Sequence, residues 1–366
     1  MADARSEVSR ARRVVVKIGS LSLAAAGGFD VCARLAACVS GHSETSFVVV
    51  SSGAIALGMK KLRYRTRPKE MARLQAAAAA GQSLLMRAYE EAFEARGVSV
   101  AQVLLTHADL ADRTRANNAR AALGALLDAA AVPILNENDS VAVEEIKFGD
   151  NDQLAAMVAP LVDAELVVLL SDVEGLLDGE GKRIKIVRDV ALEALPHVRT
   201  SSSTVGSGGM ASKIEAARRA TLAGANVVVA DARAAGVLDA VLAGEDVGTL
   251  FVAARDPLSA KKYWIAFTLR PRGDVVLDPG AADAVRAKGK SVLAVGVLGV
   301  RGDFRAGDAV RVLDTHGKEL ARGLARCGAM DAARVAGKSR DELAPELADL
   351  AVLVHADELV VGGHAP

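Results

Sequence analysis

Short apolar runs rich in Val, Ile and Leu alternate, over roughly the first 250 residues, with longer stretches whose apolar positions recur at helical spacing. We predict strands at residues 14–18, 47–52, 98–105, 132–137, 165–172 and 225–231. We predict helices at about 69–96, 114–130, 151–161 and 210–223. Near-continuous apolar strands are typical of a parallel sheet covered on both faces. The alternation therefore predicts an α/β fold, with an open, mostly parallel sheet sandwiched by helices.

The pattern changes after about residue 254, where helical stretches shorten and apolar runs are separated by glycine. These runs lie at residues 273–278, 291–300, 308–314, 319–327 and 349–361. Such spacing is typical of a small β-barrel or sandwich. A chain of 366 residues is long enough for two domains. We expect a first domain at 1–255, a linker at 256–272 and a small β-rich domain at 273–366.

Charge and composition argue against several classes of protein. Lys plus Arg and Asp plus Glu number 45 each, so the chain has no general attraction for nucleic acid or an anionic membrane. No apolar run approaches the length of a membrane span, and the charged N-terminus lacks the features of a secretory signal. The cysteines (Cys32, Cys38 and Cys327) show no metal-binding spacing, and the histidines form no ligand-spaced pair. We expect a cytoplasmic protein with no side-chain metal site.

Polar and glycine-rich motifs follow several of the predicted strands, where open α/β sheets bind their ligands. Lys17 at the end of the first strand, with Gly19 behind it, offers a charge and accessible N–H groups to an anion. Ser52 precedes a helix, so it suits an anion site or a plain N-cap. The polar run 136–139 suits recognition of an amine, a carboxylate or a metal.

The segment 206–213, Gly-Ser-Gly-Gly-Met-Ala-Ser-Lys, carries the strongest signal for anion binding. Its glycines precede a helix whose first turn holds Lys213, so N–H groups, helix dipole and lysine charge converge. It lacks the pattern of a Walker A loop. Two lysines on different elements suit phosphoryl transfer, which needs positioning and positive charge. An acid in the segment 148–152 would hold the two lysines in place.

Together these motifs resemble the amino acid kinase family, and within it the branch that phosphorylates glutamate. The matching stretches are VVVKIGS, VVVSSGAIALG, AAAGQ, VPILNENDSVAVEEIKFGDND, LLSDVEGL and GSGGMASK, in the family's order across about 12–253. The stretch after about 280 resembles a PUA domain. The segment 132–152 separates this branch from relatives that share the fold and the lysines but take other substrates.

The resemblance implies that ATP phosphorylates the γ-carboxylate of L-glutamate, giving L-glutamyl 5-phosphate in the first step of proline biosynthesis. Mg²⁺ would be held mainly through the nucleotide phosphates. The implied catalytic residues are Lys17, Lys213 and Asp152, the last organising the lysines. The implied substrate residues are Ser52, Asn136, Asp139, Asp150 and Asn151. The implied nucleotide residues are Lys17, Gly19, Ser171, Asp172, Ser207, Gly208, Gly209, Met210, Ala211, Ser212 and Lys213.

The resemblance also implies feedback inhibition by L-proline, a homo-oligomer (dimer or tetramer) and a glutamyl-phosphate reductase as a partner. Three alternatives stay open. Another kinase of the same fold would keep the lysines and change the acceptor, whereas a catalytically inactive regulator has no need of Lys17, Asp152 and Lys213. An RNA-binding protein would use the basic segments 286–290 and 301–305, but zero net charge and the lack of interleaved aromatic residues disfavour it.

Overall fold

The computed structural model describes residues 4–20, 30–141, 151–198 and 209–362. The chain divides into two compact units, Met1–Pro257 and Leu258–Pro366, here called the amino-terminal and carboxy-terminal units. Part of the segment expected to be a linker forms a short helix, α13 (Ala260–Tyr263), and a π-helical turn (Trp264–Thr268) in the carboxy-terminal unit. None of the helices in the described parts of the chain combines the length and hydropathy that crossing a bilayer requires.

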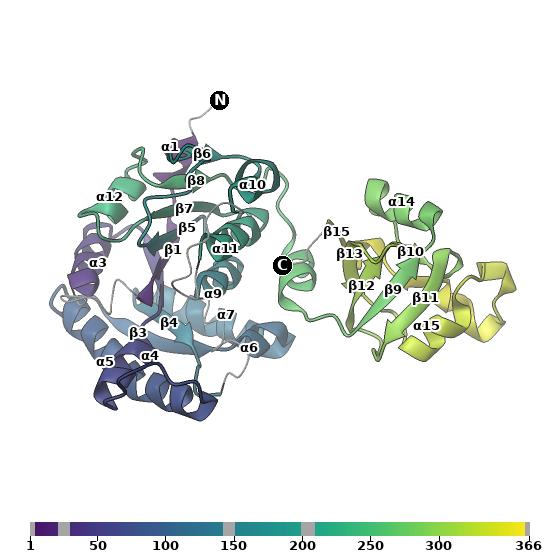
Figure 1. Ribbon diagram of the computed structural model, residues 1–366, viewed down its shortest axis with the longest axis horizontal. Helices are drawn as coiled ribbons and strands as arrows, with labels where there is room; N and C mark the ends of the chain where they lie inside the picture. The colour runs from purple at the N-terminus through teal and green to yellow at the C-terminus, as the bar shows by residue number, and fades with distance from the viewer. Residues whose placement is uncertain (1–3, 21–29, 142–150, 199–208, 363–366) are drawn as a thin grey trace. The chain divides into compact units, whose positions relative to one another are not determined.

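An eight-stranded sheet forms the centre of the amino-terminal unit (Figure 1). Its order is β3-β4-β2-β1-β5-β7-β8-β6, and neighbouring strands pair in parallel except β7 with β8. The strands are β1 (Arg13–Ile18), β2 (Ser46–Ser51), β3 (Val100–Leu105), β4 (Val132–Glu137), β5 (Leu166–Ser171), β6 (Ile186–Val187), β7 (Asn226–Asp231) and β8 (Thr249–Phe251). The predicted mostly parallel sheet is confirmed. The short strands β6 and β8 were not predicted, because two or three residues are too few to show a periodic pattern of apolar positions.

Helices cover both faces of this sheet (Figure 1). On one face lie α1 (Ala4–Val8), α3 (Asp30–Gly41), α4 (Ala54–Lys61), α5 (Met71–Glu94) and α12 (Val237–Leu242). On the other lie α6 (His107–Ala111), α7 (Arg113–Asp128), α9 (Asn151–Val158), α10 (Leu195–Val198) and α11 (Met210–Leu222). Strand residues alternate between the two cores: Val14 and Val16 enter the first, and Val15 enters the second.

Two glycines let α4 and α5 pack backbone against backbone. A Cβ atom at Gly58 would lie 1.7 Å from the carbonyl oxygen of Ala77, and one at Gly81 would lie 1.8 Å from that of Ala54. Neither position has room for a side chain. The contact fixes the start of α4 relative to Gln82, the residue after Gly81, and so shapes one edge of the candidate site.

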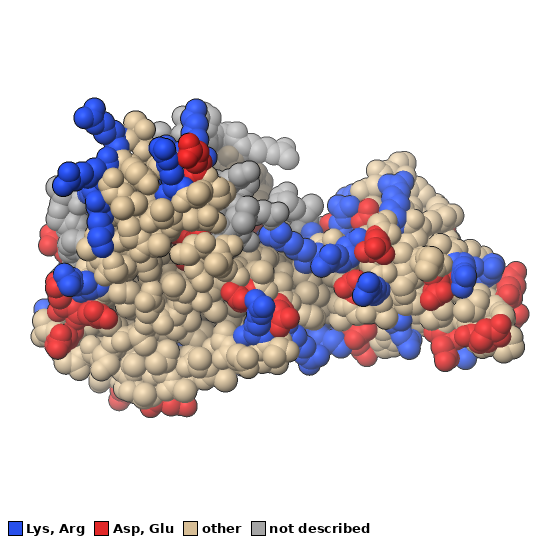
Figure 2. Space-filling model, turned by 90° about the horizontal axis from the view of Figure 1, so that it is seen from below, with Lys and Arg blue, Asp and Glu red and all other residues tan. Residues whose placement is uncertain are grey.

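The carboxy-terminal unit contains a five-stranded sheet, β11-β9-β12-β13-β15, and a two-stranded sheet, β10-β14. Its elements are β9 (Gly273–Leu277), α14 (Pro279–Lys288), β10 (Val292–Leu293), β11 (Val297–Gly302), β12 (Ala309–Leu313), β13 (Glu319–Leu324), α15 (Ala329–Val335), β14 (Val352–Val354) and β15 (Leu359–Val361). The expected β-rich architecture is confirmed. Where one strand was predicted at 291–300, a 3₁₀ turn (Ala294–Gly296) separates β10 from β11. Figure 2 shows positive and negative side chains interspersed on one face of this unit.

Candidate active site

Lys17, Asp152 and Lys213 meet inside the amino-terminal unit. Lys17 extends from β1, whereas Asp152 and Lys213 stand in the first turns of α9 and α11. The Nζ atom of Lys17 lies 2.5 Å from Oδ1 of Asp152, and the Nζ atom of Lys213 lies 3.1 Å from Oδ2. The carboxylate is fully buried, and the lysine side chains are at most 8% exposed. The acid expected to hold two lysines is therefore bound by both.

The alternation of side chains between the two faces of the sheet explains why Lys17 reaches α9 and α11. Val15 and Lys17 are two residues apart on β1 and so share a face of the sheet. Val15 belongs to the core that α9 and α11 cover. The lysine two residues later therefore points toward the first turns of those helices.

The electrostatics of this group favour an anion. Burial alone would raise the pKa of Asp152, but the charges and hydrogen bonds of Lys17 and Lys213 outweigh it and lower that pKa. One carboxylate and two ammonium groups leave a single net positive charge on three side chains that are almost fully buried. A phosphoryl oxygen would balance that charge, and a fixed charge acts strongly in such surroundings.

A second polar group lies at the ends of β2 and β4. The amide nitrogen of Asn151, beside Asp152 in the chain, donates to the Ser52 hydroxyl at 2.8 Å and to Oδ1 of Asn136 at 3.1 Å. The amide nitrogen of Asn136 in turn donates to Oε1 of Gln82 on α5, at 2.9 Å. Ser52, Asn136 and Asn151, predicted from distant motifs, are thus brought together next to the lysine pair.

Two buried atoms of this group have no hydrogen-bond partner among the described residues. They are Oδ1 of Asn151, an acceptor, and Nε2 of Gln82, a donor. Buried polar atoms are normally paired, so such atoms call for a ligand or water. A molecule carrying both an ammonium group and a carboxylate would satisfy both. Gln82 was given no role from sequence.

The predicted nucleotide residues lie at the ends of β1 and β5 and at the start of α11. The backbone N–H of Gly19 donates to the carbonyl of Leu170, at 3.2 Å, which ties the two strand ends together. The Ser171 hydroxyl donates to the carboxylate of Asp172 at 3.0 Å. Gly209 is the N-cap of α11, and Met210, Ala211 and Ser212 form its first turn. Ser207 and Gly208 lie outside the described residues.

Three further residues bear on the predicted site: Asp139, Asp150 and Gln153. Asp139 is half-buried in the turn after β4, three residues beyond Asn136, and its role stays a prediction. Asp150 lies outside the described residues. Gln153 was missed: its amide nitrogen donates to the Ser212 carbonyl at 3.0 Å, which joins α9 to the first turn of α11.

Comparison with known proteins identifies the family to which the chain belongs. The chain belongs to the amino acid kinase family, whose sequence model matches residues 12–231, and a PUA domain model matches residues 273–347. The glutamate 5-kinases of Trichlorobacter lovleyi and Myxococcus xanthus are 42% and 45% identical to it. These matches cover 99% of this chain and 100% of the first relative, and 98% of both chains for the second. The predicted resemblance is confirmed.

One further relative and one solved structure also match the chain. The glutamate 5-kinase of Variovorax paradoxus is 46% identical over 96% of each chain. A solved structure of N-acetylglutamate synthase from Neisseria gonorrhoeae, complexed with coenzyme A and N-acetyl-glutamate, matches with a TM-score of 0.51 and 17% identity. It covers 78% of this chain and 68% of that one. At this identity the likeness concerns the fold alone.

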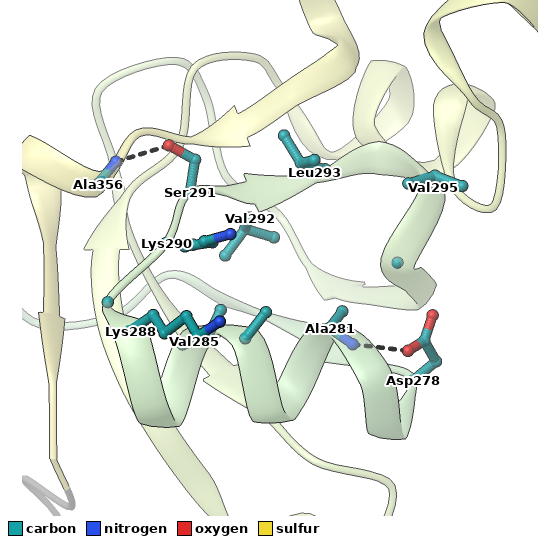
Figure 3. A pocket seen from close by; sticks show the side chains of 13 residues that line it. Asp278, Ala281, Val285, Lys288, Lys290, Ser291, Val292, Leu293, Val295 and Ala356 are labelled. Atoms are coloured by element: carbon teal, nitrogen blue, oxygen red, sulfur yellow. Dashed lines mark hydrogen bonds between the residues drawn. The ribbon is translucent and has the colours of Figure 1, made fainter.

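A groove of about 610 Å³ lies in the carboxy-terminal unit between α14 and β10 (Figure 3). Lys288 and Lys290 stand at one end of it, and Val285, Val292 and Leu293 are among the apolar side chains that line it. None of the described residues that line it is aromatic.

Proposed function

We infer that the chain transfers the γ-phosphoryl group of ATP to the γ-carboxylate of L-glutamate, giving ADP and L-glutamyl 5-phosphate, the first step of proline biosynthesis. One observation carries this inference. The buried pair Lys17 and Lys213, joined by Asp152, lies directly beside the polar group formed by Ser52, Asn136 and Asn151. Relatives of 42–46% identity over nearly the whole chain are glutamate 5-kinases.

The reaction needs little covalent chemistry from the protein. The γ-carboxylate of glutamate is ionised at neutral pH, so it attacks without a general base. An oxygen–phosphorus bond forms to that carboxylate while the bond from the γ-phosphorus to the bridging oxygen of ADP breaks. Lys17 and Lys213 stabilise the negative charge on the transferring group, and Asp152 holds both ammonium groups in position.

The substrate residues are assigned by their free hydrogen-bonding capacity. Oδ1 of Asn151 accepts a hydrogen bond from the substrate ammonium group, and Nε2 of Gln82 donates one to a substrate carboxylate. Their unpaired, buried state supports both assignments. The remaining substrate residues in this proposal are Ser52, Asn136, Asp139 and Asp150.

The nucleotide is placed at the ends of β1 and β5 and at the start of α11. The helix dipole and the exposed N–H groups at Gly209 suit its phosphates. The residues proposed to contact it are Lys17, Gly19, Ser171, Asp172, Ser207, Gly208, Gly209, Met210, Ala211, Ser212 and Lys213.

Mg²⁺ accompanies ATP in most kinases, where it bridges phosphate oxygens and neutralises charge. We propose that it is held mainly through the nucleotide, because both oxygens of the buried Asp152 carboxylate already bind lysines. A cytoplasmic location, inhibition by L-proline, assembly into a dimer or tetramer and transfer of product to a glutamyl-phosphate reductase belong to the same proposal.

The decisive experiment compares acceptors. Purified protein is given Mg²⁺ and ATP with L-glutamate, L-aspartate, N-acetylglutamate or uridylate, and the acyl phosphate is trapped with hydroxylamine. Glutamate-dependent ADP release with hydroxamate formation is expected. Turnover with another acceptor would keep the lysine mechanism and discard the substrate assignments. A mock preparation from cells that do not express the protein measures turnover by contaminating kinases.

A further inference from the structure

Cys38, His42 and Asp239 form a cluster outside the candidate active site. Cys38 lies on α3 and His42 directly after its end, while Asp239 lies on α12, which packs beside α3 (Figure 1). The Nδ1 atom of His42 is 3.8 Å from the sulfur of Cys38 and 3.9 Å from a carboxylate oxygen of Asp239. All three ligand atoms lie within 4.8 Å of one another.

We propose that these three side chains bind a Zn²⁺ ion, with one coordination position left open. Zn²⁺ lies about 2.3 Å from sulfur and about 2.0–2.2 Å from nitrogen or oxygen, which puts tetrahedral ligand atoms about 3.4–3.6 Å apart. The separations of 3.8 and 3.9 Å from Nδ1 of His42 need to contract by only a few tenths of an ångström. The sulfur of Cys38 and the carboxylate oxygen of Asp239 lie within 4.8 Å, so this pair closes by about 1 Å at most. His42 directly follows the last residue of α3, and its ring folds back toward Cys38, so the sulfur and Nδ1 already face one another.

The donor set selects the kind of ion. A thiolate and an imidazole favour Zn²⁺ over Mg²⁺, which prefers oxygen ligands. One thiolate and one carboxylate balance the two positive charges of the ion. This site is therefore distinct in chemistry from the Mg²⁺ proposed to accompany ATP.

Binding requires two local changes with balanced chemistry. The sulfur–hydrogen bond of Cys38 breaks, its proton leaves to solvent and the sulfur–zinc bond forms. Nδ1 of His42 now lies 2.9 Å from the Cys38 carbonyl oxygen. It must present its lone pair instead, as it does when the proton is on Nε2 and the ring turns slightly away from that carbonyl. Burial, together with the neighbouring Asp239 carboxylate, raises the pKa of the Cys38 thiol.

The surroundings give an ion access to the cluster. Cys38 is buried, but the side chains of His42 and Asp239 are 34% and 56% exposed. A cavity of about 160 Å³ is lined by Cys38 and Asp239, and it is large enough to hold a water molecule. Arg34 also lines this cavity, with its guanidinium directed to the Arg233 carbonyl at 3.5 Å.

A bound ion would join α3 to α12 on the same face of the sheet. Sequence reasoning overlooked the site because it searched for pairs of cysteines and pairs of histidines. The signal was a mixed pair, Cys38 and His42, at helical spacing. The third ligand comes from residue 239, which the fold alone brings close.

The test uses the full chain, reduced and freed of metal by a chelator. Zn²⁺ is titrated against a chromogenic chelator, and Co²⁺ is added separately as a spectroscopic probe. We expect one Zn²⁺ per chain, an increase in Tm on Zn²⁺ addition, and a thiolate-to-Co²⁺ charge-transfer band. Absence of stoichiometric binding, or a Co²⁺ spectrum without that band, would overturn the proposal.

Variants locate the ion. His42→Gln changes a half-buried side chain and Asp239→Asn an exposed one, so both variants should fold, and Cys38→Ser removes the thiol. Each should weaken Zn²⁺ binding by at least about 100-fold, because even residues that merely orient a metal ligand change affinity about 10- to 100-fold. His355→Gln is the matched control, since His355 lies 3.4 Å from Asp357 on the surface with no thiol in that pair. Equal Zn²⁺ affinity in all four variants would place the ion elsewhere and reject the site.

Discussion

The side-chain nitrogen of Lys17 lies 2.5 Å from a carboxylate oxygen of Asp152 in the interior of the amino-terminal unit. An ion pair this deeply buried contributes little net stability, because both charges lose their hydration. The ion pair instead fixes the positions of the charged groups. Asp152 fixes the end of a long, flexible side chain, and with Lys213 on its other oxygen it spaces two positive charges around one place for a phosphoryl group.

Lys213→Ala should lower kcat by about 10²- to 10³-fold, the usual effect of removing one group that stabilises transition-state charge. The KM for glutamate should stay nearly unchanged, because the substrate residues belong to a different group of side chains. Steady-state kinetics with glutamate and ATP varied in turn measure both. Lys182→Ala is the control, since this exposed lysine pairs only with Glu180 in the contacts described. Unchanged turnover in Lys213→Ala would remove this residue from catalysis.

Asp152→Asn should destabilise the amino-terminal unit by about 3–5 kcal/mol at neutral pH, because two buried ammonium groups lose their counter-charge. The pKa of Asp152 is lowered in the folded protein from its ordinary value of 3.8. Its ionised form therefore stabilises the fold above that value, and the contribution is lost as pH falls through the lowered pKa.

The stability difference between the wild type and Asp152→Asn should thus be constant above about pH 5 and shrink in stronger acid. Urea unfolding followed by helical circular dichroism measures it. Tryptophan fluorescence would not report on the unfolding of the amino-terminal unit, since the single tryptophan, Trp264, belongs to the carboxy-terminal unit. A difference that stays constant into strong acid would show that the charge on Asp152 does not stabilise the fold.

The sequence predicted six of the eight strands of the main sheet and the helices α5, α7, α9 and α11, because their patterns repeat over enough residues. No residue ranges were predicted for the helices α3, α4, α6 and α12. Helix α5 (Met71–Glu94) and strand β4 (Val132–Glu137) lie within two residues of their predicted limits. The lysine pair was also predictable, since each lysine stands beside glycines at an element's end. Gln82 and Gln153 were not, because their roles depend on which side chains face them across helices, and local pattern carries no such information.

Asn151→Ala should raise the KM for glutamate about 10- to 100-fold, the range expected for a lost hydrogen bond to a charged group. Asp139→Ala should also raise the KM for glutamate. Ser171→Ala should instead raise the KM for ATP, which makes it the matched comparison for the nucleotide side. If Asn151→Ala or Asp139→Ala changed only the KM for ATP, the two binding regions would have been assigned the wrong way round.

Gly58→Ala should destabilise the amino-terminal unit by about 1–3 kcal/mol or more, since added atoms in a packed interior strain it. The new Cβ would lie 1.7 Å from the Ala77 carbonyl oxygen, so only separation of α4 from α5 can relieve the clash. That separation also moves the start of α4 away from Gln82, and the KM for glutamate should rise. Urea unfolding and kinetics on the same preparation test both effects.

Gly124→Ala provides the control for this change. Gly124 lies within α7, and nothing approaches the position of its missing Cβ within 4 Å. Alanine there should stabilise the protein by about 0.5–1 kcal/mol, because it loses less backbone freedom on folding than glycine. Equal stability changes in Gly58→Ala and Gly124→Ala would mean that α4 and α5 do not need their close contact. A loss of stability at Gly58 with normal glutamate binding would separate the packing of these helices from the shape of the substrate site.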